Sequence, residues 1–161
     1  MSEGKSSKRW LLVVALVAGG ALLALLVVAG VLVGIAVPAW RNAVVVSNET
    51  AVIRTLKTIS NEQQVYLRTH GRYATFEELY AAGALDARFN AGAPLVEGYT
   101  YTLKVTPPVQ RQTPFFSINA DPEQTEGLPA TGKKFFYLDS RDDFVRFDTA
   151  GTASATDPIL E

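Results

Sequence analysis

Hydrophobic and polar residues follow three successive patterns along the chain. The first is an unbroken run from Leu11 to Val37 that contains no charged and no strongly polar residue. The second continues to Gly71 and places apolar residues at helical spacing, and the third alternates apolar with polar residues. Helical spacing indicates an amphipathic helix and alternation indicates a half-buried strand, so the chain predicts a long helical region followed by a sheet.

The apolar run is long enough to cross a membrane. As a helix rising about 1.5 Å per residue it extends roughly 40 Å, against about 30 Å for the hydrocarbon core of a bilayer. Trp10 and Trp40 bracket the run, and indole rings favour the two membrane–water interfaces. We therefore expect residues 10–38 to form a transmembrane helix, with Trp10 and Trp40 as its interface anchors.

The segment before the run, residues 1–9, is basic, because Lys5, Lys8 and Arg9 oppose a single Glu3. Positive residues beside the first span stay in the cytoplasm, which predicts a cytoplasmic head and places everything after about residue 40 outside. The alternative is a cleavable secretory signal. The apolar part of such a signal is usually about 7–15 residues, which is shorter than this run.

Gly30 and Gly34 form a pair of small residues four positions apart inside the apolar run. Such a pair lets a second helix approach closely and gain packing contacts in lipid, so it indicates a helix–helix contact. The alternative is that the two glycines reflect only the high glycine content of transmembrane helices.

Beyond the apolar run, residues 39–71 predict an amphipathic continuation of the helix. Pro38 is expected to end or kink the apolar part, because proline has no N–H and its ring clashes with the preceding turn. Gly71 indicates the C-terminal end of the helix. The apolar stripe consists of Val45, Val52, Leu56, Ile59 and Tyr66.

A short helix and several strands follow. Thr75 and Glu78 form a capping box that predicts a helix start, and Gly83 predicts its end. Turn-rich connections between alternating segments favour an antiparallel meander. Strands are expected at 99–105, 115–119, 134–138 and 144–147, with Tyr99, Tyr101, Phe115, Phe116, Phe135 and Phe136 in the core.

Together these elements predict an α+β fold. A long N-terminal helix, transmembrane in its first half and amphipathic in its second, packs on a small antiparallel sheet of about four strands. The globular domain is expected to span residues 72–150, and the tail, residues 151–161, to be loosely ordered.

Composition narrows the chemistry. The chain balances 15 Lys and Arg against 16 Asp and Glu, so it has no positive excess for nucleic acid. Without cysteine it has no disulfides, thiol catalysis or iron–sulfur clusters, and a single His70 excludes sites that need two imidazoles. No nucleophile or dinucleotide motif occurs. We expect no enzyme activity, no cofactor, no nucleic-acid partner and no small-molecule substrate.

One acidic cluster is the candidate for a metal site. Asp139, Asp142 and Asp143 lie close together in the sequence, with Asp148 nearby. Calcium takes about six to eight oxygen ligands, which carboxylates supply. A solvated hairpin turn is the favoured interpretation, since aspartate favours turns through local hydrogen bonds, so we expect no metal and keep calcium as the alternative.

The order of these features resembles that of type IV pilins and of the pseudopilins of type II secretion. In that family a half-apolar N-terminal helix carries a small antiparallel sheet. The similarity covers most of residues 30–150. It rests on the segments Gly34–Pro38, Ala51–Ile59, Glu62–Tyr66, Gly71–Leu79 and Phe136–Asp139.

The chain departs from the family near its N-terminus. Pilin precursors have a glycine at the leader cleavage point, and Lys8–Trp10 contains none. They also carry a glutamate early in the apolar run, which pairs with the N-terminal amine of a neighbouring subunit. Counting back from Pro38 puts that glutamate at Ala21, and no Asp or Glu occurs between Glu3 and Glu49.

The resemblance implies a non-catalytic structural protein of the bacterial inner (cytoplasmic) membrane, with its C-terminal domain in the periplasm. Two hypotheses follow. In one, the chain is an accessory subunit of a membrane complex, and its transmembrane helix contacts other membrane subunits and the lipid bilayer. In the other, it is a pilin or pseudopilin subunit of a type IV pilus or type II secretion filament.

Overall fold

A computed structural model describes residues 4–106, 113–127 and 130–160 of the chain. It has an α+β fold in which one long helix, α1 (Gly4–His70), precedes a five-stranded antiparallel sheet. The chain divides into two compact units, Met1–Trp40 and Arg41–Glu161. The boundary between them lies within two residues of the predicted end of the transmembrane segment.

The first unit is the apolar part of α1. Every residue from Trp10 to Trp40 is exposed, so the large aliphatic side chains of this part have no protein partner within the described chain. By length and composition, this is the one helix among the described residues that is able to cross a membrane. Pro38 lies inside α1, so the alternative that this proline ends the helix is wrong. Loss of one N–H does not stop a helix whose flanking residues retain their own hydrogen bonds.

In the second unit, α1 buries one stripe of side chains. Val45, Val52, Leu56 and Ile59 are at most 4% exposed, as their helical spacing predicts. The helix ends at His70, where Gly71 takes a φ of +71° and its N–H donates to the carbonyl of Leu67 at 2.8 Å. That left-handed conformation suits glycine, which confirms the predicted stop.

Two short helices lead into the sheet. Helix α2 (Phe76–Ala81) begins at the predicted capping box, with the Thr75 hydroxyl and the Glu78 carboxylate each accepting from the other residue's backbone N–H. A 3₁₀ turn, η1 (Ala87–Phe89), follows. The strands are β1 (Leu95–Val96), β2 (Tyr99–Thr106), β3 (Phe115–Pro122), β4 (Phe135–Asp139) and β5 (Arg146–Asp148).

The strands pair in chain order, β1-β2-β3-β4-β5, and every pair is antiparallel. This is the predicted meander with one strand more than expected. The additional strand, β1, has two residues and pairs Val96 with Tyr99 across a tight turn. Both central residues of the turn, Glu97 and Gly98, have positive φ, as two-residue hairpin loops require.

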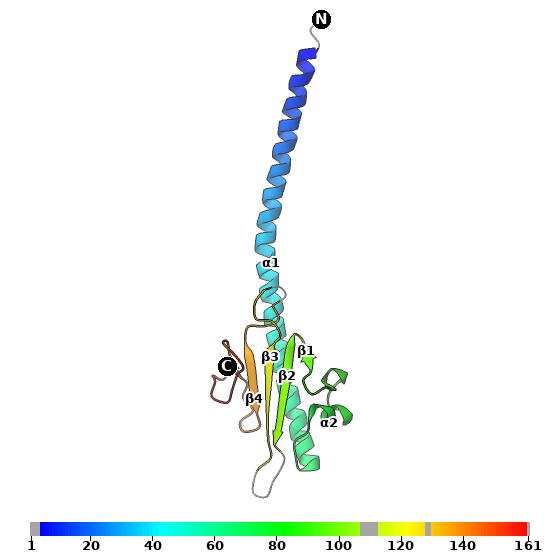
Figure 1. Cartoon of the computed structure of the whole chain (residues 1–161), viewed down its shortest axis with the longest axis vertical. Helices are drawn as coiled ribbons and strands as arrows, with labels where there is room; N and C mark the ends of the chain where they lie inside the picture. Colours follow the sequence, from blue (N-terminus) through cyan, green and yellow to red (C-terminus); the bar gives the residue numbers. More distant parts are fainter. Residues whose placement is uncertain (1–3, 107–112, 128–129, 161) are drawn as a thin grey trace. The chain divides into compact units, whose positions relative to one another are not determined.

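The hydrophobic core lies between α1 and one face of the sheet, and Figure 1 draws the cyan-to-green part of the helix alongside the strands. Alternation along β3 and β4 turns Phe116 and Phe136 into this core. Phe115 and Phe135 point to the opposite face and are only half-buried, so the expectation that all six strand aromatics form the core is wrong for these two.

The C-terminal segment covers part of that opposite face. Ala153 is buried, and its carbonyl accepts from the amide of Asn119 on β3 at 2.6 Å. Farther on, the N–H of Leu160 donates to the carbonyl of Val145 at 2.8 Å. The described tail residues are thus bound to the domain by Asn119 of β3 and by Val145, which directly precedes β5.

Candidate functional site

The residues that are predicted to contact the membrane or another helix are exposed in the apolar unit. Trp10 and Trp40 are 67% and 61% exposed. Gly30 and Gly34 lie one helical turn apart, and a Cβ added to either would meet no atom within 4 Å. The backbone at these two glycines is therefore open to another helix.

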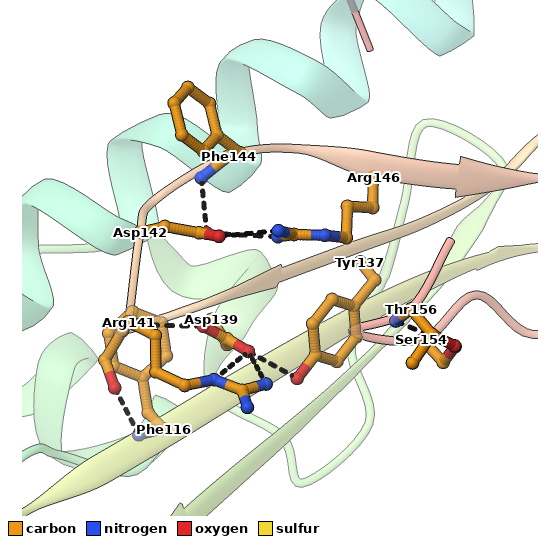
Figure 2. A network of polar contacts seen from close by, with 10 residues as sticks. Phe116, Tyr137, Asp139, Arg141, Asp142, Phe144, Arg146, Ser154 and Thr156 are labelled. Carbon is orange, nitrogen blue, oxygen red and sulfur yellow. Dashed lines mark hydrogen bonds and ion pairs between the residues drawn. The ribbon is translucent and has the colours of Figure 1, made fainter. Parts of the chain in front are cut away.

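The three aspartates that were the calcium alternative lie in and beside the loop between β4 and β5, and each binds a different cation. Asp139 accepts from the guanidinium of Arg141 and, at 2.8 Å, from the hydroxyl of Tyr137 (Figure 2). Burial opposes ionisation of this carboxyl, but the bonds from Arg141 and Tyr137 outweigh it. The pKa of Asp139 is therefore lowered.

Asp142 faces the other way along the loop. Its two oxygens accept from the guanidinium of Arg146 at 3.0 and 2.5 Å, and one of them also accepts from the N–H of Phe144 at 3.1 Å (Figure 2). The bonds from Arg146 and, to a smaller extent, from the Phe144 N–H lower the pKa of Asp142 to about 2. The carboxylate closes the β4–β5 turn as a structural ion pair.

Asp143 ties the same loop to α1. Its carboxylate accepts from Lys57 at 3.0 Å and from the hydroxyl of Ser60 at 2.5 Å, and its carbonyl also accepts from Lys57. Its φ is +59°, an uncommon conformation for a residue other than glycine. The three bonds from α1 hold the loop in this conformation.

This arrangement does not support calcium binding by the loop. Among the described residues, no three His, Asp or Glu side chains converge on a point where a metal ion would fit. The reason is that Arg141, Arg146 and Lys57 each satisfy one aspartate. Sequence proximity brought the acids into one loop, but the cations beside them direct the carboxylates apart.

His70 lies at the C-terminal end of α1 and is exposed. Its ring stacks on Tyr66 with centroids 3.9 Å apart, and its Nδ1 lies 2.7 Å from the hydroxyl of Thr69. These contacts are local to the last turn of the helix, where a cationic side chain also suits the helix dipole.

Two polar anchors beyond the predicted set fix the segment after α1. Gln63 lies in the buried stripe, and its amide binds both the N–H and the carbonyl of Ala74, at 2.9 and 2.7 Å. Arg72 pairs with both oxygens of Glu78, at 2.6 and 2.8 Å. The bond from Arg72, with that from the Thr75 N–H, lowers the pKa of Glu78 to about 2.

A cavity of about 810 Å³ also escaped sequence reasoning. It lies in the Arg41–Glu161 unit, beside the first residues of α1 in that unit. Its lining is polar and charged at several positions and apolar at others. The residues that matter most for its chemistry are Arg41, Thr125, Glu126, Lys133, Phe135 and Thr149.

Polar residues of α1 position one wall of this cavity. The amide of Asn48 donates to the carbonyl of Thr131 at 2.8 Å, and Glu49 accepts from the backbone N–H of Lys133 at 3.0 Å. Glu49 also lies 3.6 Å from the ammonium of Lys134. A sequence feature that points toward this cavity is Arg41, the first charged residue after the apolar run.

Comparison with known proteins yields no matching family model, no matching curated protein and no matching solved structure.

Proposed function

We propose that this protein is a single-pass, membrane-anchored structural subunit with a pilin-like domain, serving as an accessory component of a membrane protein complex. The observation that carries the proposal is the contrast within α1. From Trp10 to Trp40 every side chain is exposed although nearly all are apolar, whereas Val52, Leu56 and Ile59 are fully buried. A bare apolar helix joined to a folded domain suits a lipid anchor.

The proposed orientation follows from charge. Lys5, Lys8 and Arg9 precede the apolar segment and favour a cytoplasmic N-terminus in the bacterial inner membrane. The α+β domain then lies on the periplasmic side. The open backbone at Gly30 and Gly34 supports a contact with another membrane helix.

A non-catalytic role is consistent with how the charged groups of the domain are used. Asp139, Asp142 and Asp143 each bind a cationic side chain of the same domain. Glu78 likewise forms an ion pair with Arg72. Acid–base chemistry requires a titratable group near the operating pH that is able to reach a substrate, and these ion-paired carboxylates serve the fold.

The second candidate function is a subunit of a type IV pilus or type II secretion filament. The order of sequence segments between residues 30 and 150 favours it. The absence of Asp and Glu between Glu3 and Glu49 weighs against it, because the apolar segment then has no carboxylate to pair with a neighbouring subunit's amine. In pilins, the pairing with that amine stabilises the glutamate, because an unpaired charge inside a membrane is costly.

Mass spectrometry of the tagged protein, purified from its native membranes in mild detergent, separates the two candidates. It reports the state of the N-terminus and the proteins that copurify in fixed ratio. An intact basic head together with an otherwise unrelated membrane complex is the expected result. A trimmed N-terminus together with pilins or a secretion platform would contradict the accessory role and support the filament.

A further inference from the structure

We propose that the cavity lined by Arg41 and Lys133 binds the phosphate of a phospholipid headgroup at the surface of the membrane. The inference rests on the proposed membrane anchor and adds a ligand to it. The cavity volume, about 810 Å³, is within the range that holds small ligands.

The cavity carries positive charge that no ion pair among the described residues uses. Arg41 and Lys133 both line the cavity, and within the described part of the chain neither has an ion-pair partner. The Nε of Arg41 is buried and has no hydrogen-bond partner among these residues. These described residues therefore leave both cations without a carboxylate partner, and a bound oxyanion would pair with them at the cavity surface.

Glu49 does not neutralise the side chains of these two cations. Glu49, the nearest anchoring carboxylate, accepts from the backbone N–H of Lys133 and pairs its other oxygen with Lys134. The ammonium of Lys134 also lies 5.2 Å from the ring centroid of Phe147. Glu49 and Lys134 therefore pair with each other, and the side chain of Lys133 lines the cavity without an ion-pair partner among the described residues.

One residue of the cavity lining is next to the apolar segment in the sequence. Arg41 directly follows Trp40, the tryptophan that marks the outer end of the apolar segment and therefore the membrane–water interface. Because Arg41 is one residue from Trp40 in the sequence, the proposed anchor places this lining residue near the depth at which lipid phosphates lie. This location favours a lipid phosphate over a phosphate group free in solution.

The charges that line the cavity indicate which lipid headgroup fits. Glu126 lines the same cavity as Arg41 and Lys133, so the site offers two cations and one carboxylate. A headgroup with a phosphate and a primary amine matches this set, because the phosphate pairs with the cations and the ammonium with the carboxylate. Thr125 and Thr149 add hydroxyl groups, and Phe135 adds an apolar wall for the glycerol end.

The test uses the full-length protein in a maltoside detergent. Native mass spectrometry measures retention of added phosphatidylethanolamine and phosphatidylglycerol, with inorganic phosphate as the soluble competitor. The variants are Arg41→Gln, Lys133→Gln and their combination. The control is Arg68→Ala, which removes an exposed cation from α1 at 27 residues, or roughly 40 Å, from Arg41.

We expect each cavity variant to bind phosphatidylethanolamine about fivefold more weakly, and the Arg68 control to bind it as the wild type does. Glu126→Gln should remove the preference for phosphatidylethanolamine over phosphatidylglycerol without abolishing binding of either. The backbone N–H of Lys133 still reaches Glu49 in Lys133→Gln, so circular dichroism of this variant should match the wild type.

Equal lipid retention by the wild type and the double variant would overturn the inference and leave the membrane anchor untouched. Displacement of lipid by inorganic phosphate at equal concentration would assign the site to a soluble phosphate and overturn the lipid assignment. Extraction of the wild-type protein from membranes at alkaline pH would overturn the anchor and the lipid site together.

Discussion

The two halves of α1 share one backbone conformation but meet opposite surroundings. Large side chains of the first half, such as Leu16 and Leu25, are 80% and 66% exposed, whereas Leu56 and Ile59 of the second half are fully buried. The first half is apolar on all sides, which suits lipid, and the second is apolar on one stripe, which suits a sheet. The distribution of apolar positions around the helix therefore distinguishes a membrane anchor from a core element.

Polar residues differ between the halves in the same way. In the second half they fasten loops to the helix: Asn48 and Glu49 hold residues 131–134, Ser60 holds Asp143, and Gln63 holds Ala74. The first half has no strongly polar side chain between Leu11 and Val37. The polar contacts that attach these loops to the helix therefore come from its second half.

The largest test of this comparison removes the first half. A fragment of residues 41–161 should be soluble and folded, because it contains the whole hydrophobic core. Circular dichroism should report the helix and sheet, and fractionation should move the protein from the membrane to the soluble pool. A fragment that is unfolded or aggregated would show that the domain depends on the apolar segment.

The next test compares the same substitution in the two halves. Leu56→Ala should lower the free energy of unfolding of the domain by about 2–5 kcal/mol, because it leaves a cavity in the core. Leu23→Ala, at a side chain that is 65% exposed, should leave that free energy unchanged. Denaturant titration of the full-length protein in detergent, followed by near-ultraviolet circular dichroism, measures both. Similar losses in the two variants would contradict the comparison.

A smaller effect is expected for the helix contact. Replacing both Gly30 and Gly34 with leucine fills the open surface of the apolar helix and should weaken association with its partner by about 1–2 kcal/mol. Membrane insertion should be unchanged, since leucine is at least as apolar. Crosslinking in membranes measures the association, and unchanged crosslinking would remove the proposed contact.

The smallest effect concerns pH. The pKa of Glu78 is lowered from an ordinary 4.5 to about 2 by Arg72 and by the N–H of Thr75. The ion pair therefore stabilises the fold above about pH 4.5, and this contribution is lost as the pH falls toward 2. Both side chains are partly exposed, so the contribution is below about 1 kcal/mol.

Glu78→Gln isolates this contribution, because the glutamine carbonyl is still able to cap the helix. The unfolding midpoint of the variant should fall less steeply between pH 5 and about 2 than that of the wild type. Parallel slopes would show that Arg72 and Glu78 add nothing to folding.

The sequence was sufficient for the elements whose signal is local. The stripe of Val52, Leu56 and Ile59, the stop at Gly71 and the capping box at Thr75 each depend on a few neighbouring residues, and the structure confirms them. The antiparallel order of the strands followed from short connections. These features need no knowledge of distant parts of the chain.

The features that escaped prediction depend on contacts between distant residues. Strand β1 has only two residues and exists because Val96 pairs with Tyr99. The tail is bound by Asn119 on β3. Gln63 is a polar residue that the sequence alone places at the surface, but it is buried because its amide binds the backbone of Ala74. For the aspartates, two of the bound cations, Arg141 and Arg146, are only two and four positions away. Only Lys57, which is 86 positions from Asp143, depends on the fold.

Cysteine labelling tests the central claim most directly. The claim is that the first half of α1 lies in lipid and the second half lies in a domain that is exposed to water. The chain has no cysteine, so Ser6→Cys, Leu23→Cys and Asn61→Cys each create one thiol. A membrane-impermeant maleimide applied to the periplasmic side should label Asn61→Cys quickly, Leu23→Cys not at all, and Ser6→Cys only after the membrane is permeabilised. Equal labelling of Leu23→Cys and Asn61→Cys would contradict the account.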